Sequence, residues 1–255
     1  MLSFLNVAAG PIEQFEVKKL MEWAPGGLDL SFTNASAYMV LGSLLVIALF
    51  WFASSKGNIV PTRLQSVAEI GYGFVADMVR GAAGEEGLKF FPFVFTLFFF
   101  ILAANMIGMV PYAFTTTSHI IVTGALSLLV ISIVLIYGLW KNGLGFFKLF
   151  APSGAPWYIY ILLIPIEIIS FLARPLTLAL RLFANMLAGH IMLKLFAGFA
   201  VTGLAAGGVG LLVSPLAFGM GVALNALEFL VAGLQAYVFA ILTCVYLNDA
   251  LHPSH

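Results

Sequence analysis

Five charged side chains stand inside two long and otherwise apolar stretches of this sequence, at about 157–200 and 215–248. They are Glu167, Arg174, Arg181, Lys194 and Glu228. If the stretches cross a membrane, each charge at the bilayer centre costs about 2.5–3.5 kcal/mol on insertion scales. For Arg174 and Lys194, ion pairing or a side chain that extends to the membrane interface explains the charge as well as a functional role does. For Arg181 the functional explanation is favoured.

Two groups on these stretches can exchange protons. They are the imidazole of His190, which titrates near physiological pH, and the carboxyl of Glu228. Asn185 and Gln235 do not ionise, but their amides can hold water or orient a carboxyl. Arg181 stays protonated, so it acts as a fixed charge that attracts a carboxylate and repels a hydrated proton. The set suits a proton path that contains a barrier.

The spacing of these residues places them on defined helix faces. Glu167, Arg174 and Arg181 follow one another at intervals of seven, and Asn185 lies four beyond Arg181, so all four share one face. Small residues beside this face allow another backbone to approach; they are Ala184 and Ala188. His190 lies on the opposite side of the same helix.

The second stretch carries Glu228 and Gln235, again seven apart. Glycines at 203–210 and Pro215 separate the two stretches and predict a turn. In an antiparallel hairpin about this turn, His190 is expected level with Glu228, and Arg181 level with Gln235.

Several catalytic motifs are missing from the sequence. It has no Walker A loop, no HExxH motif and no Ser nucleophile elbow. Its one cysteine, Cys244, excludes a disulfide framework and a Cys-rich metal site. We therefore expect no nucleotide site, no cofactor, no metal, and no enzymatic chemistry by the chain alone.

The composition indicates an all-α polytopic membrane protein. Of the 255 residues, 62% are hydrophobic and 9% charged, which excludes a water-soluble globule. The 11 basic and 11 acidic residues balance, which excludes a polybasic nucleic-acid surface. We expect about five to six membrane helices, the last two long, strongly tilted and paired as a hairpin.

The order of elements follows from the apolar runs. Residues 1–35 are expected on the outer side, with a short surface helix between 12 and 23, and 36–255 form the membrane domain. The expected elements of that domain are a span at 36–53, an amphipathic cytoplasmic-side helix at 61–82, spans at 91–110 and 119–140, and the long helices 157–200 and 215–248.

Lysine and arginine in the short loops predict the orientation. The loops at 55–89 and 141–156 carry these residues, whereas 111–118 and 201–214 carry none. The basic loops should face the cytoplasm. A bacterial inner membrane is the first choice of location, and the mitochondrial inner membrane, with the matrix as the basic side, is the second.

Several segments resemble one known family. The stretch RPLTLALRLFANMLAGH at 174–190 resembles the signature of subunit a of F-type ATP synthases. The resemblance extends to LEFLVAGLQAYVFAILTCVYL at 227–247, PTRLQSVAEIGYGFV at 61–75 and NMIGMVP at 105–111. It covers most of the chain after about residue 36, and residues 1–35 are the least specific part.

This resemblance implies a proton-channel subunit that faces a rotor ring of c subunits. The other partners it implies are peripheral-stalk b subunits and the complete ATP synthase complex. It implies that Arg181 is the essential arginine, and that Asn185, Glu228 and Gln235 line the outer half-channel. His190 stands where some bacterial members have Glu, with the partner position exchanged as well. Two further residues are assigned to the cytoplasmic half-channel; they are Glu167 and Arg174.

Other functions stay open at this point. A stand-alone secondary transporter or channel predicts repeated, interrupted helices, and no such repeat is visible. A membrane enzyme needs a nucleophile or metal cluster, and a passive scaffold does not explain the buried charges.

Overall fold

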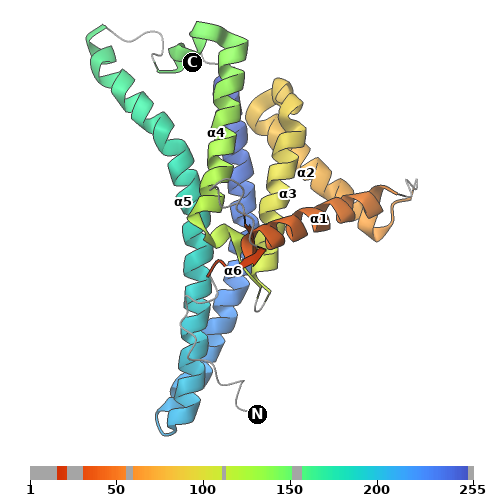
Figure 1. The fold of residues 1–255 in the computed structure, drawn as a ribbon, viewed down its shortest axis with the longest axis vertical. Coiled ribbons are helices and arrows are strands. Elements are labelled where there is room, and N and C mark those ends of the chain that lie inside the picture. The colour runs from red at the N-terminus through yellow and green to blue at the C-terminus, as the bar shows by residue number, and fades with distance from the viewer. Residues whose placement is uncertain (1–15, 22–30, 56–59, 111–112, 151–156, 252–255) are drawn as a thin grey trace.

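The computed structural model describes residues 16–21, 31–55, 60–110, 113–150 and 157–251. It contains six long helices, which confirms the all-α class (Figure 1). They are α1 (Asn34–Ser54), α2 (Arg63–Gly87), α3 (Phe91–Gly108), α4 (Ile120–Asn142), α5 (Trp157–Ala206) and α6 (Gly210–Leu251). Short 3₁₀ turns are η4 (Leu88–Phe90), η5 (Thr116–Ser118) and η6 (Gly143–Phe150). Within the described residues, five segments are long and apolar enough to cross a membrane, with α2 and α3 counted together.

α5 and α6 form a long antiparallel hairpin (Figure 1). The turn between them is shorter than the sequence pattern predicts. Gly207 and Gly208 adopt positive φ angles of 65° and 55°, which only glycine reaches without strain. On either side of the turn, Gly203 and Gly210 pack closely together. A Cβ on Gly210 would overlap the Gly203 backbone, and one on Gly203 would lie 3.0 Å from the Gly210 carbonyl oxygen. Pro215 lies inside α6 rather than ending it.

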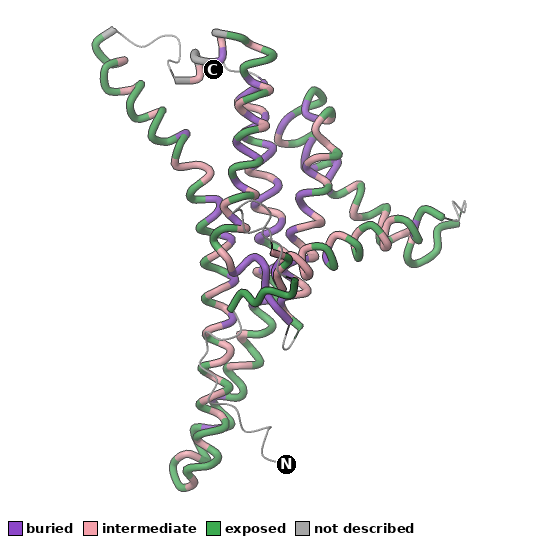
Figure 2. Tube along the Cα trace, viewed as in Figure 1, coloured by how far each residue is buried: buried purple, intermediate pink, exposed green. Residues whose placement is uncertain are grey.

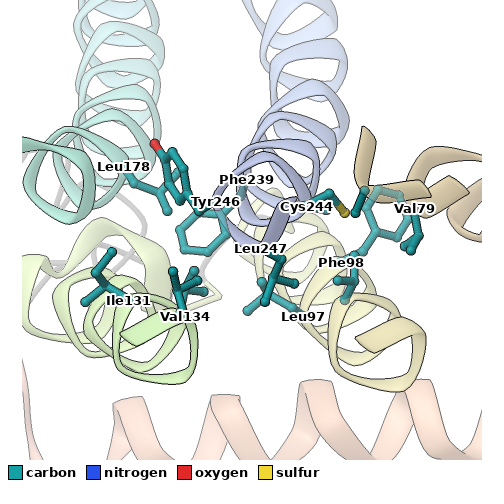
Figure 3. Close-up of a cluster of buried hydrophobic side chains, with 14 of the residues drawn as sticks. Val79, Leu97, Phe98, Ile131, Val134, Leu178, Phe239, Cys244, Tyr246 and Leu247 are labelled. Atoms are coloured by element: carbon teal, nitrogen blue, oxygen red, sulfur yellow. The ribbon is translucent and has the colours of Figure 1, made fainter. Parts of the chain in front are cut away.

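α6 occupies the centre of the buried core. Its side chains Phe239, Cys244 and Leu247 are fully buried and belong to one cluster with residues of α2, α3, α4 and α5 (Figure 3). Away from this core the hairpin and α1 expose apolar side chains (Figure 2). Helices that are apolar on their outer faces are stable in lipid, not in water.

The amphipathic pattern at 61–82 corresponds to α2. Its second half buries Val75 and Val79 in the core, while Asp77 and Arg80 on the other face stay exposed and pair at 3.4 Å. Gly84 breaks the helix with a φ of 67° and reverses the chain toward α3.

The expectation of a surface helix at 12–23 is wrong for the described residues 16–21. There the chain is extended, and β1 (Lys19–Met21) pairs antiparallel with β2 (Phe32–Thr33). The Asn34 side chain accepts a hydrogen bond from the Lys18 amide at 3.2 Å and donates one to the Glu16 carbonyl at 3.1 Å. These bonds to the start of α1 hold the segment extended, and they outweigh its weak amphipathic pattern. Residues 12–15 and 22–23 lie outside the described residues.

Candidate functional site

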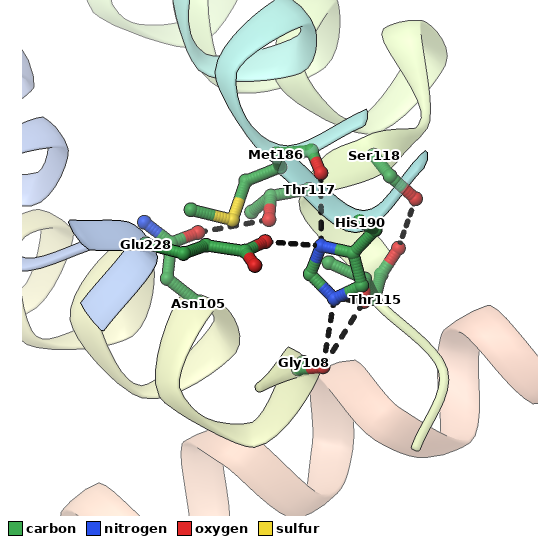
Figure 4. A network of polar contacts seen from close by, with 8 residues as sticks. All are labelled: Asn105, Gly108, Thr115, Thr117, Ser118, Met186, His190 and Glu228. Carbon is green, nitrogen blue, oxygen red and sulfur yellow. Dashed lines mark hydrogen bonds and ion pairs between the residues drawn. The ribbon is translucent and has the colours of Figure 1, made fainter. Parts of the chain in front are cut away.

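The centre of the site is the pair formed by His190 of α5 and Glu228 of α6. The Nδ1 atom of His190 lies 2.6 Å from Oε1 of Glu228 (Figure 4). Both residues are buried, with 7% and 5% of their surfaces exposed. The hairpin therefore brings together the two proton-exchanging groups that the sequence places at one level.

A buried loop between α3 and α4 closes around this pair. Thr115 Oγ1 and the Gly108 carbonyl lie 3.0 and 2.9 Å from Nε2 of His190. The Thr117 hydroxyl donates to Oδ1 of Asn105 at 2.8 Å, and the Asn105 amide donates to the Ala232 carbonyl of α6 at 3.1 Å. All of these side chains are buried.

This loop was not predicted to be part of the site. A polar run such as the one at 115–119, between two spans, usually marks an exposed turn. One signal was available, namely that four hydroxyl residues and a histidine follow one another between two spans. A run of short side chains that bond locally is compatible with a buried polar loop.

His119 ends the same loop. Its ring stacks on Phe114 with centroids 4.9 Å apart, and its Nε2 has no hydrogen-bond partner among the described residues. Burial lowers the pKa of this imidazole, because burial disfavours the charged form.

A second polar contact joins the hairpin one to two turns away. The Asn185 amide donates to Oε1 of Gln235 at 2.8 Å. The sequence pattern predicts that Arg181 is level with Gln235, whereas the residue bonded to Gln235 is Asn185, one helical turn away. Sequence position alone cannot distinguish two residues that lie one turn apart on the same helix face. Of the two, Asn185 has the shorter side chain, and it is the one within hydrogen-bonding distance of Gln235.

Arg181 lies on the exposed face of α5, together with Ala184 and Ala188. Its guanidinium has no hydrogen-bond or ion-pair partner among the residues that the structure describes. An exposed and unpaired cation on an apolar helix is costly in lipid, so such a residue usually faces water, reaches the interface or pairs with a negative group. The small residues beside it would allow another helix to approach.

Arg174 pairs with a carboxylate, Asp249, that the sequence pattern does not single out. Its Nη1 atom lies 2.7 Å from Oδ2 of Asp249 near the end of α6, and its guanidinium stacks over the rings of Phe171 and Tyr246. Asp249 follows the last apolar stretch, so it resembles an ordinary helix-end charge in the sequence. Only the hairpin geometry identifies it as the partner.

The two remaining candidates lie apart from these contacts. Glu167 is half-buried near the start of α5 and has no ion-pair partner within the described part of the chain. Lys194 is half-buried one turn beyond His190. Within the described ranges, no three His, Cys, Asp or Glu side chains are grouped in a way that could hold a metal ion.

Comparison with known proteins decides the family. A family model for the ATP synthase A chain matches residues 36–248. The chain belongs to the ATP synthase A chain family.

Named members of the ATP synthase A chain family match this chain over almost its full length. ATP synthase subunit a of Hyphomonas neptunium is 76% identical over 246 residues, which cover 96% of this chain and 97% of that protein. The subunit a of Maricaulis maris is 62% identical and covers 96% of this chain and 98% of its own length. That of Mesorhizobium japonicum is 57% identical, covering 96% and 97%. These matches confirm the resemblance of the sequence to subunit a of F-type ATP synthases.

Gly189 gives the first prediction for this family member. A Cβ at this position would lie 2.7 Å from Oε1 and 2.8 Å from Cδ of Glu228. Gly189→Ala should displace the carboxyl from His190 and strongly reduce proton pumping, measured in membrane vesicles. The matched control is Gly198→Ala on the same helix, where an added Cβ meets no atom within 4 Å. Equal activity of the two variants would show that the position of the carboxyl is unimportant.

Proposed function

We propose that this chain is the proton-translocating subunit a of an F-type ATP synthase. It supplies two half-channels that couple proton flow to rotation of a c-subunit ring, and it performs no enzymatic step by itself. The observation that supports this most is the buried His190–Glu228 pair on a hairpin that also exposes the unpaired Arg181.

The outer half-channel consists of His190, Glu228, Asn185 and Gln235. Two contacts support this assignment, the 2.6 Å His190–Glu228 pair and the 2.8 Å Asn185–Gln235 hydrogen bond. The pair lies beside the loop 113–118, which belongs to the side of the membrane without lysine or arginine in its loops. A proton that enters here passes to a carboxylate of the ring, which can then move into lipid because it is neutral.

The cytoplasmic half-channel involves Glu167 and Arg174, with Asp249 as an added member. Arg174 and Asp249 lie near the end of α6, where Lys141 pairs with Glu86 at 2.6 Å. Lys141 and Glu86 belong to the basic loops at 55–89 and 141–156. The two polar sites therefore lie at opposite ends of the core formed by α3, α4 and α6.

Arg181 separates the two sites. Along α5 it lies about 10 Å from Arg174 and about 14 Å from His190, at 1.5 Å rise per residue. From this place its fixed charge keeps a passing ring carboxylate ionised and opposes a direct proton leak between the half-channels. Each proton moved through 100 mV supplies about 2.3 kcal/mol, so several are needed for one ATP.

Copurification tests the proposed assembly. The chain, tagged and extracted in mild detergent, should bring down a ring of small hairpin subunits, the peripheral-stalk b subunits and the ATPase head. Arg181→Ala is the matched variant, because loss of one charge should leave assembly intact. Recovery of the chain alone would instead favour a stand-alone transporter.

The membrane orientation follows from the same proposal. Residues 1–35 and 201–214 face the outside and the basic loops face the cytoplasm of a bacterial inner membrane. Single cysteines at Ser55 and at Ala206, both exposed, should react with impermeant reagents from the cytoplasmic and the outer side respectively. Cys244 is fully buried and should add no background. Labelling from the reverse sides would overturn the orientation.

A further inference from the structure

Oxygen atoms surround both nitrogens of the His190 ring (Figure 4). Nδ1 lies 2.6 Å from Oε1 of Glu228 and 2.9 Å from the Met186 carbonyl oxygen. Nε2 lies 2.9 Å from the Gly108 carbonyl oxygen and 3.0 Å from the hydroxyl of Thr115. The two edges differ in one respect, since only the Nδ1 edge faces a group that can itself carry an exchangeable acid proton.

The partners of Nε2 favour a hydrogen on that atom, because the Thr115 hydroxyl could donate to an unprotonated Nε2 but the Gly108 carbonyl could not. A carbonyl oxygen only accepts hydrogen bonds, so an unprotonated Nε2 would direct its lone pair at the Gly108 oxygen. With Nε2 protonated, the ring donates to this oxygen and to Thr115. The Thr115 hydroxyl can then donate to the same Gly108 carbonyl, which lies 3.4 Å away. Both hydrogen-bond donors at this edge, the Nε2 hydrogen and the Thr115 hydroxyl, then have an acceptor.

The Nδ1 edge allows a proton to move. One proton can pass from Nδ1 to Oε1 of Glu228, which converts an imidazolium–carboxylate pair into a neutral imidazole and a carboxylic acid without changing the total charge. The Glu228 acid then donates to Nδ1, which offsets the Met186 carbonyl oxygen that the unprotonated Nδ1 also faces at 2.9 Å. Neither carboxylate oxygen of Glu228 accepts a hydrogen bond from another described side chain or backbone group. The carboxyl is thus the end of the pair from which a proton can leave.

Thr115 is held in place by its own loop. The Ser118 hydroxyl donates to the Thr115 carbonyl at 2.6 Å, and Thr117 is tied through Asn105 to the Ala232 carbonyl of α6. The buried loop therefore fixes the Thr115 hydroxyl relative to the hairpin that carries His190.

We propose that Thr115 is a positioning residue which, with the Gly108 carbonyl, keeps a proton permanently on Nε2 of His190, so that protons are exchanged only at the edge shared with Glu228. His190 is then a held partner of Glu228 and not a relay that passes protons through its ring. This inference rests on the proposed proton transfer at the pair.

Nitrogen-15 NMR of the assembled complex with labelled histidine tests the inference directly. The His190 signals are assigned by their loss in His190→Gln. In the unmodified complex Nε2 should be protonated. In Thr115→Val that protonation should weaken, and ATP-driven pumping should fall about tenfold, as expected for losing one hydrogen bond to a charged group. Thr115→Ser, which restores the hydroxyl, should recover both readouts.

Thr116→Val is the matched control, because Thr116 is buried in the same loop and has no described contact with His190. An unprotonated Nε2 in the unmodified complex, or identical behaviour of Thr115→Val and Thr116→Val, would overturn the inference. Normal pumping by Glu228→Gln would instead overturn the proposed function. The NMR readout separates the two failures because it does not depend on transport.

Discussion

Replacing Arg181 by alanine should abolish ATP-driven proton pumping and ATP synthesis while passive proton movement continues. In the proposed function the guanidinium is the fixed charge between the two half-channels, and it cannot release its proton. Without it a ring carboxylate is no longer kept ionised between the sites, and the barrier to a direct leak is lost. The titrating groups His190 and Glu228 remain, so protons still reach the centre of the membrane.

The measurement combines three quantities in membrane vesicles: the amount of the subunit, ATP-driven acidification, and passive proton flux through the membrane sector. Because Arg181 is exposed and unpaired within the described chain, its removal should leave folding intact. Arg63→Ala, which removes an exposed arginine at the start of α2, serves as the control and should pump normally. Intact pumping by a normally assembled Arg181→Ala protein would remove this residue from the mechanism.

Lysine should not substitute for Arg181. An ammonium group keeps the charge, but it can lose its proton when buried and lacks the planar fork that holds a carboxylate in two contacts. Arg181→Lys is therefore expected to assemble and to remain uncoupled. A coupled Arg181→Lys enzyme would show that charge alone suffices.

Breaking the His190–Glu228 pair should have the second large effect. Removing one partner of a buried ion pair costs about 3–5 kcal/mol, because the other is left without compensation. His190→Glu and Glu228→His each place two like groups in the buried site and should lose nearly all pumping. The exchanged double variant restores one acid and one base and should pump better than either single variant.

The double variant is read against the single variants in the same vesicles. Gly189 packs closely against the Glu228 carboxyl, so a histidine ring at position 228 must shift slightly. We therefore do not expect the double variant to recover full pumping activity. Subunit content controls for assembly. Activity of the double variant below both single variants would show that the two residues do not act as a pair.

Part of this protein could be derived from its sequence, for local reasons. Composition determines the membrane class, because lipid accepts apolar surfaces that water does not. The intervals of seven determine which residues share a helix face, and the glycines at 203–210 require the chain to reverse. Together these relations were enough to bring His190 and Glu228 to one level.

Other parts depended on packing between distant segments. The polar loop at 113–118 is buried because α1, α3, α4 and α5 pack around it, and no local pattern specifies that packing. Asp249 becomes the partner of Arg174 only when the hairpin places the end of α6 beside α5. Residues 19–21 form a strand because they pair with 32–33, where a helical pattern alone was misleading. Sequence periodicity thus determined which residues share a helix face and which lie at the same level of the hairpin. Tertiary contacts decided which polar groups complete the site.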